Sequence, residues 1–172
     1  MSAAPPTDHR ASEREGRRLA LGAVFEADFG MRTPQRVLER RLEEEGSDPV
    51  AASLARTLVV AVAVHRDAID AEIERRAPQY PVVQLARIDR ALLRSGMGEL
   101  LHCPATPTRV AVSEWVEMAR TYSGESTRRL VNGVLGQVAN ASSRKGPDRG
   151  GHTGPETGIK HVTTGHEEGA PQ

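Results

Sequence analysis

The chain has 172 residues, of which 23 are basic and 23 acidic, so its formal net charge at neutral pH is zero. This length fits one domain with terminal extensions, and the balanced charge excludes a global field that draws the chain to nucleic acid or membrane. Any electrostatic partner must be recognised by a local patch. The single cysteine, Cys103, excludes an internal disulfide and a cysteine-based metal cluster.

The compartment is predicted to be the cytoplasm. A lone cysteine fits a reducing environment, and the N-terminus lacks the apolar core of a secretory signal. No run reaches the ~18 apolar residues of a membrane span. We therefore expect no membrane association.

Both ends are predicted to be disordered, which leaves a folded domain over residues 12–140. Residues 1–11 form the N-terminal tail. Residues 141–172 contain seven glycines, three prolines and no aromatic side chain, so they cannot bury enough surface to offset their ordering entropy. This tail contains three histidines, His152, His161 and His166. They could bind a metal weakly, but their irregular spacing is more typical of solvated residues.

Between the tails, apolar residues recur at helical spacing, and no segment alternates like a strand. Ser12 is expected to cap a first helix that ends near Gly30. A short helix is predicted over residues 34–45. Asp48-Pro49 is typical of the next helix start, with a capping carboxylate followed by proline at the first helical position.

The third helix has the clearest period. Its stripe advances by four, four, three, four and four residues through Leu54, Leu58, Val62, His65, Ile69 and Ile73. Further helices are expected around residues 85–96, from the cap residue Thr108 to Tyr122, and over residues 125–139. The predicted fold class is therefore all-α, a compact bundle of about six to seven helices.

The residue types that enzymes use are scattered along the chain. His65 lies on an apolar stripe, which favours a core or boundary histidine over a ligand. Cys103 lies beside His102 in a loop without the local signature of a nucleophile. Gly96-Met97-Gly98 interrupts a helix and follows no strand, which favours close helix packing over a phosphate cradle. We expect no catalytic residue, no cofactor and no metal, and hence no enzyme.

Arginines gather at the predicted starts of the first and last helices. Four of them repeat at i, i+4, i+7 and i+8, which predicts one stripe: Arg10, Arg14, Arg17 and Arg18. Arg128 and Arg129 open the last helix in the same way. Guanidinium groups at a helix start suit backbone phosphate and stacking on unpaired bases. The arginines are candidate RNA contacts, and a solvated charged face is the alternative.

Three segments resemble the NusB family of transcription antitermination factors. Arg17–Phe25 is like its arginine-rich start that runs into an Ala-Leu-Tyr element, with Phe25 in place of tyrosine. Ile88–Leu100 is like its acid, base, Ala-Leu-Leu-Arg and later Glu-Leu pattern, with Gly98 in place of tyrosine. Pro107–Leu135 is like its Val-Ala-Ile-Asn-Glu and Phe-Val-Asn-Gly-Val-Leu elements, with serine for asparagine and leucine for phenylalanine.

The resemblance implies an all-helical protein that binds the boxA element of nascent, chiefly ribosomal, RNA. It also implies a partner, the small-subunit ribosomal protein NusE, with which it helps RNA polymerase resist termination. Asn132 joins the arginines as an RNA candidate. The implied partner contacts are Phe25, Asp89, Arg90, Arg94 and Glu99.

Asp89 and Gly133 could have structural roles in addition to the functional ones. Asp89 either meets a basic surface of NusE or, with Glu99, neutralises Arg90 and Arg94 within the domain. Gly133 stands inside a helix, where glycine is unfavourable, so close approach of a neighbouring helix is expected there.

Two other functional classes remain. Ribosomal-RNA cytosine methyltransferases carry a NusB-like domain, but residues 141–172 are too short and polar for the methyl-transfer domain that must follow. A helical protein-interaction module without RNA binding would gain nothing from the arginine stripe. The free chain is either a monomer or a homodimer, because an apolar surface that awaits a partner can pair with itself.

Overall fold

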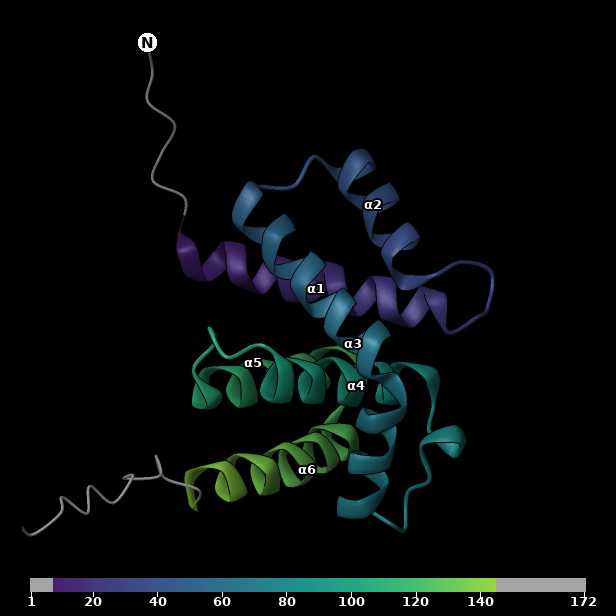
Figure 1. The fold of residues 1–172 in the computed structure, drawn as a ribbon, viewed down its shortest axis with the longest axis vertical. Coiled ribbons are helices and arrows are strands. Elements are labelled where there is room, and N and C mark those ends of the chain that lie inside the picture. The colour runs from purple at the N-terminus through teal and green to yellow at the C-terminus, as the bar shows by residue number, and fades with distance from the viewer. Residues whose placement is uncertain (1–7, 145–172) are drawn as a thin grey trace, which may run out of the picture.

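The computed structural model describes residues 8–144, and within that range the chain is helical with no strand (Figure 1). Six α-helices and one 3-10 turn follow in the order α1 (His9–Ala27), α2 (Pro34–Glu45), α3 (Pro49–Arg76), η1 (Val82–Gln84), α4 (Arg87–His102), α5 (Thr108–Tyr122) and α6 (Glu125–Arg144). The predicted all-α bundle is therefore confirmed.

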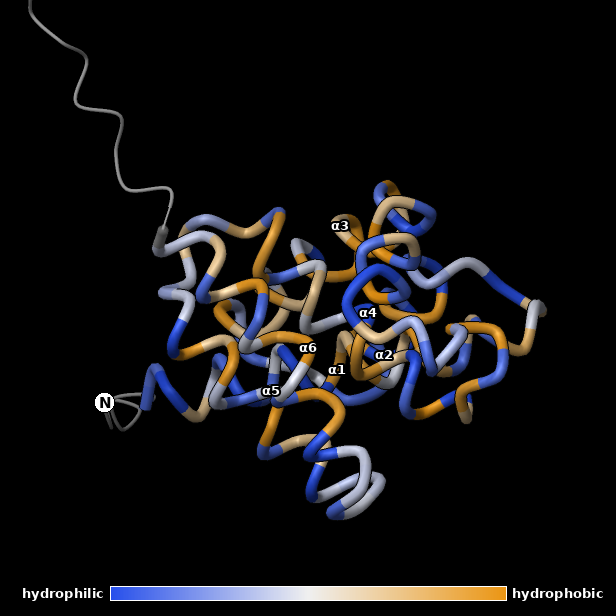
Figure 2. Tube along the Cα trace, turned by 90° about the horizontal axis from the view of Figure 1, so that it is seen from below, coloured by the Kyte–Doolittle hydropathy of each residue, from blue (hydrophilic) through white to orange (hydrophobic). Residues whose placement is uncertain are grey.

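The helices form two groups that are joined by α4. α1 packs on α2 and α3, and α5 packs on α6. α4 contacts α1, α3, α5 and α6, and every residue from Ala91 to Glu99 is buried. Polar and apolar residues alternate around the turns of each helix, as Figure 2 shows, so each helix turns an apolar side inward. α4 is thus the central helix that joins both groups.

Several helix ends were predicted correctly. α2 covers residues 34–45 as expected, and Gly46 closes it with a left-handed φ of 65°. The Asp48 carboxylate then accepts hydrogen bonds from the backbone N–H groups of Val50 and Ala51, at 3.2 and 3.1 Å. These bonds satisfy two free donors at the start of α3.

Other helix ends differ from the prediction. α1 begins at His9, and Asp8 rather than Ser12 caps it by accepting from the backbone N–H of Arg10. Pro107 holds the cap position of α5 without a side-chain bond, so Thr108 is already helical. α6 continues to Arg144, past the predicted tail boundary. The rest of both predicted tails, residues 1–7 and 145–172, lies outside the described range. The three histidines of the C-terminal tail are among these residues.

Glycines on α4 allow its neighbours to approach closely. A Cβ on Gly96 would lie 2.8 Å from Cδ1 of Leu135 and 3.2 Å from Cγ of Trp115, and one on Gly98 would lie 3.0 Å from Cγ2 of Val62. The predicted packing role of this pair is therefore confirmed. Gly133 differs, because no atom of a neighbouring helix lies within 4 Å of a Cβ built on it. The expectation of close packing at Gly133 is wrong.

α3 is the one helix in the described range that is long and apolar enough to cross a membrane. Its inward side chains, including Leu58, Ile69 and Ile73, are fully buried in the common core. Its backbone departs from helical geometry at His65, with φ −108° and ψ 17°. The half-buried His65 ring stacks on His102 of α4, with centroids 3.7 Å apart and planes 7° from parallel. The prediction of a boundary histidine is confirmed.

The histidine stack predicts that acid destabilises the fold. Burial lowers the pKa of His102, and the charge of His65 lowers it further. The folded state therefore binds protons less readily than the unfolded chain, and stability should fall as pH drops from neutral through about 6.5, the usual histidine pKa. Melting temperatures across this range should show the loss. His102→Gln should flatten the profile, and an unchanged profile would assign the pH dependence to other groups.

Candidate nucleic-acid interface

The arginines at the start of α1 do not form the single stripe that was predicted. Arg14 donates to Glu114 of α5, with Nε 3.0 Å from Oε2. Arg18 turns the other way and donates to Glu15 and to Glu45 at the end of α2. Positions 10, 14, 17 and 18 span an arc of about 100° around the helix. Since α1 is surrounded by other helices, that arc is wide enough for the side chains to meet different neighbours.

Arg17 lies inside the protein. Its side chain is 1% exposed and donates two hydrogen bonds to Glu99 of α4, at 3.0 and 2.8 Å. Trp115 of α5 donates its indole N–H to the same carboxylate at 2.6 Å. Arg17 and Glu99 are both shielded from solvent, so the predictions of Arg17 as an RNA contact and Glu99 as a partner contact are wrong.

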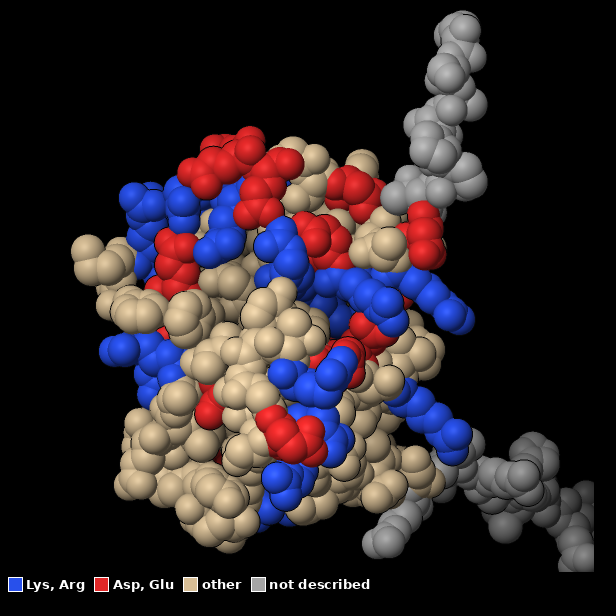
Figure 3. All heavy atoms as spheres, turned by 180° about the vertical axis from the view of Figure 1, so that it is seen from behind, with Lys and Arg blue, Asp and Glu red and all other residues tan. Residues whose placement is uncertain are grey.

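Other arginines of α1, α5 and α6 gather on one surface, which we call the arginine face. A hydrogen bond from Arg120 lowers the pKa of Glu117, and the charges of Arg14 and Arg128 lower it further, so side chains of three helices lie near one carboxylate. Figure 3 shows this side of the molecule, with basic groups running downward and acidic groups between them. The arginine face consists of Arg10, Arg14, Arg109, Arg120 and Arg128, all in exposed or half-buried positions. The exposed Arg129 lines the groove on the other side of α6, toward α3.

A shallow groove between α5 and α6 adjoins the arginine face. It encloses about 600 Å³ and is lined by Arg14, Arg109 and Asn132, among others. Asn132 is exposed. Three of the predicted RNA contacts, Arg14, Arg128 and Asn132, therefore lie on the helices that flank α5, namely α1 and α6. Sequence reasoning missed Arg109 and Arg120, because it had no reason to place α5 between α1 and α6.

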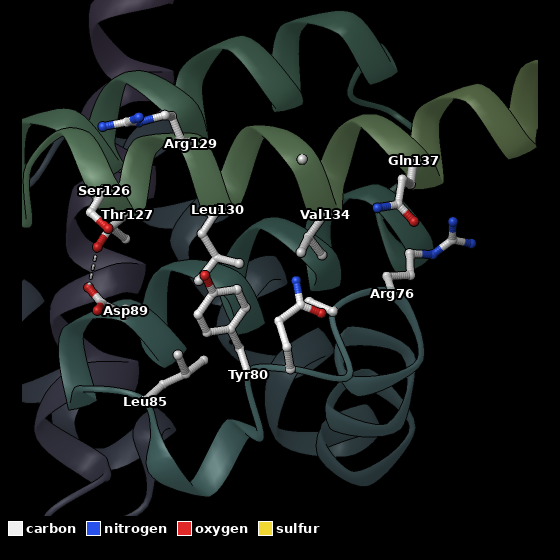
Figure 4. Close-up of a pocket in the computed structure, with 13 residues that line it drawn as sticks. Arg76, Tyr80, Leu85, Asp89, Ser126, Thr127, Arg129, Leu130, Val134 and Gln137 are labelled. Atoms are coloured by element: carbon white, nitrogen blue, oxygen red, sulfur yellow. Dashed lines mark hydrogen bonds between the residues drawn. The ribbon is translucent and has the colours of Figure 1, made fainter.

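A second groove, of about 520 Å³, separates α6 from the end of α3 and the loop that follows. We call it the α3–α6 groove. In Figure 4 the ring of Tyr80 points toward Leu130, and Arg76 and Gln137 lie at the opposite end from Asp89. Gly133 also lines the groove. The absence of a side chain at Gly133 keeps the groove open at this point. This accounts for a glycine inside α6 better than close packing of helices does.

Asp89 closes one end of the α3–α6 groove. Its carboxylate accepts hydrogen bonds from the hydroxyl groups of Ser123 and Thr127, at 2.5 and 3.0 Å. These residues join the end of α5 to the start of α6. Asp89 does not pair with the arginines on its own helix, so the alternative in which it neutralises Arg90 and Arg94 is wrong.

Acids from other helices neutralise Arg90 and Arg94 instead. Both donate to Asp28 at the end of α1, and Arg94 also donates twice to Asp70 of α3, at 2.8 Å each. Arg94 is buried and unavailable to a partner, which contradicts that prediction. Arg90 is half-buried, as is Phe25. Both side chains keep some accessible surface, so their contact with a partner protein stays a prediction.

The single thiol and the possible metal ligands bear on the expectation that the chain has no catalytic residue. Burial raises the pKa of the Cys103 thiol to about 11, with a further contribution from Glu99, so it is a poor nucleophile at neutral pH. No group of three or more His, Cys, Asp or Glu within residues 8–144 could hold a metal. The surface offers exposed cations and open grooves, which suit binding.

The family model for NusB matches residues 14–140. The chain belongs to the NusB family. It is 38% identical over 128 residues to the transcription antitermination protein NusB of Heliobacterium modesticaldum, an alignment that covers 74% of this chain and 62% of that relative, so the chain spans less than two thirds of it.

Solved structures support the NusB fold. The chain matches NusB of T. maritima at a TM-score of 0.69 and 29% identity, over 74% of this chain and 90% of that one. It also matches a chain from a crystal structure of the antitermination factors NusB and NusE in complex with dsRNA. There the TM-score is 0.69 and the identity 23%, over 76% and 98% of the two chains.

Proposed function

We propose that this chain is a transcription antitermination factor that binds boxA-type single-stranded RNA in nascent, chiefly ribosomal, transcripts. It acts in the cytoplasm with NusE, as part of an RNA polymerase complex that resists termination, and it has no catalytic role. The NusB family assignment supports this role, as does the NusB–NusE–dsRNA complex of a structural neighbour. The observation that carries the proposal is the arginine face, which gathers guanidinium groups from three helices.

Three guanidinium groups of the arginine face are paired with carboxylates in the free chain. Arg14 pairs with Glu114, Arg120 with Glu117, and Arg128 with Glu125. RNA phosphates must therefore displace carboxylates from the guanidinium groups, which limits the gain from each contact. We therefore expect the chain alone to bind RNA with modest affinity.

The adjoining α3–α6 groove supplies the less charged part of the interface. Exposed Tyr80 gives an aromatic ring on which an unpaired base can stack. Asp89 at the end of the groove gives a carboxylate for a basic partner, as expected of a ribosomal protein that contacts RNA. RNA and NusE would then lie side by side across the start of α6.

Replacing Arg14 and Arg128 together with alanine should weaken binding to a boxA-like single strand. The slope of log affinity against log salt should fall by about one to two, because two phosphate contacts are lost. Fluorescence titration at several salt concentrations measures both effects. The matched control is Arg56→Ala with Arg75→Ala, which removes two exposed arginines of α3. Unchanged affinity at low salt would favour the alternative, a protein-interaction module without RNA binding.

Asp89→Asn should weaken binding to NusE, mainly by slowing association at low salt. Asparagine can still accept hydrogen bonds from Ser123 and Thr127, so the melting temperature should be unchanged. Titration with NusE tests this, with Asp67→Asn on the exposed side of α3 as the control. Normal NusE binding by a variant that melts early would make Asp89 a packing residue.

Sedimentation of the free chain would show whether it also forms a homodimer.

A further inference from the structure

A second cluster of guanidinium groups surrounds Asp28, away from the arginine face. Arg90 and Arg94 donate hydrogen bonds to its carboxylate. Arg66 and Arg87 approach the same carboxylate, at 3.9 and 3.8 Å, without forming a hydrogen bond. Four cations thus converge on one buried anion, and only Arg94 has a second acid, Asp70. The cluster carries excess positive charge.

The excess charge borders an open pocket between the α1–α2 loop and α3, of about 450 Å³. The loop lies at the edge of the bundle in Figure 1. Asp28 is the only acidic residue that lines this pocket. Four arginines also line it: Arg32, Arg36, Arg66 and Arg94. Within residues 8–144, neither Arg32 nor Arg36 lies within ion-pair distance of a carboxylate, and both are exposed.

The start of α2 adds to the unfavourable charge. Arg36 lies in the first turn of this helix, which contains no acid. The backbone N–H groups at a helix start already carry partial positive charge, so a cation there is repelled rather than stabilised. A bound anion would relieve this repulsion together with that around Asp28.

We infer that this pocket binds a phosphate group, held chiefly by Arg32, Arg36 and Arg66. The planar guanidinium group donates in pairs to phosphate oxygens. The three arginines come from the α1–α2 loop, α2 and α3, and a tetrahedral phosphate offers oxygens in as many directions. A carboxylate has two oxygens in one plane and a single charge, and suits the arrangement less well. The phosphate belongs either to a small ligand or to an RNA strand.

The first arm of the test uses inorganic phosphate and pyrophosphate, added to the full chain at constant ionic strength. Millimolar amounts should raise the melting temperature of the native chain, because a ligand that binds only the folded state stabilises it. Arg36→Ala with Arg66→Ala should abolish the rise, and Arg56→Ala with Arg75→Ala should retain it. Without phosphate, the first double variant should melt no earlier than the native chain, since it loses repulsion.

The second arm distinguishes the two sources of phosphate. If RNA supplies it, Arg36→Ala with Arg66→Ala weakens binding to the boxA-like strand, and inorganic phosphate competes with the strand. If a small ligand supplies it, RNA affinity is unchanged while the phosphate-induced stabilisation is lost. The single variant Arg32→Ala repeats both arms with a smaller change to the protein. Stabilisation that is absent from the native chain, or equal in the native chain and the pocket variants, would overturn the assignment.

Discussion

Replacing Arg17 with alanine should destabilise the domain by about 3–5 kcal/mol, because it leaves a buried charge without its partner. Glu99 is 1% exposed, and Arg17 supplies the only cation bonded to it. The indole N–H of Trp115 would remain as a single neutral donor. The variant also loses the packed aliphatic part of Arg17 where α1, α4 and α5 meet. Urea denaturation of the native chain and the variant measures the difference.

Two comparisons separate the buried charge from general sensitivity at the start of α1. Arg14→Ala removes an exposed arginine one turn earlier and should change stability little. Arg17→Met combined with Glu99→Met removes both charges and should recover much of the loss, because well-packed apolar groups can replace a buried ion pair. If the double variant is no more stable than Arg17→Ala, packing rather than charge explains the effect.

Gly16→Ala should destabilise the domain by about 1–3 kcal/mol, because the new methyl group has no space. Its Cβ would lie 2.8 Å from the backbone carbonyl oxygen of Ala51 and 3.1 Å from Cβ of Leu54. A carbonyl within a helix cannot rotate away as the end of a side chain can. α1 and α3 must therefore separate, or their common core must loosen. Thermal and chemical denaturation should agree on the loss.

Gly133→Ala is the matched control for this substitution. It makes the same change inside a helix, but its Cβ meets open space. Since alanine is favoured over glycine in a helix interior by about 1 kcal/mol, the variant should be neutral or slightly more stable. Destabilisation at Gly133 as large as at Gly16 would show that backbone geometry, and not close approach, governs both positions.

The sequence by itself determined the helices and the family. Apolar spacing along the third helix and the Asp48-Pro49 start depend on interactions within a few residues, so local chemistry predicts them. The segments that resemble NusB likewise needed no coordinates. The same local reasoning misplaced the ends of α1 and α6, where several nearby residues can serve as the cap or the last turn.

Only the tertiary structure decided which of these residues face solvent. Arg14 and Arg17 are one turn apart on the same helix, yet one pairs at the surface with a residue 100 positions away and the other is buried with a partner 82 positions away. Helical spacing defines directions around one axis and does not say which neighbour covers each direction. The arginine face and the Asp28 cluster both depend on that arrangement, because long side chains find their partners across helices.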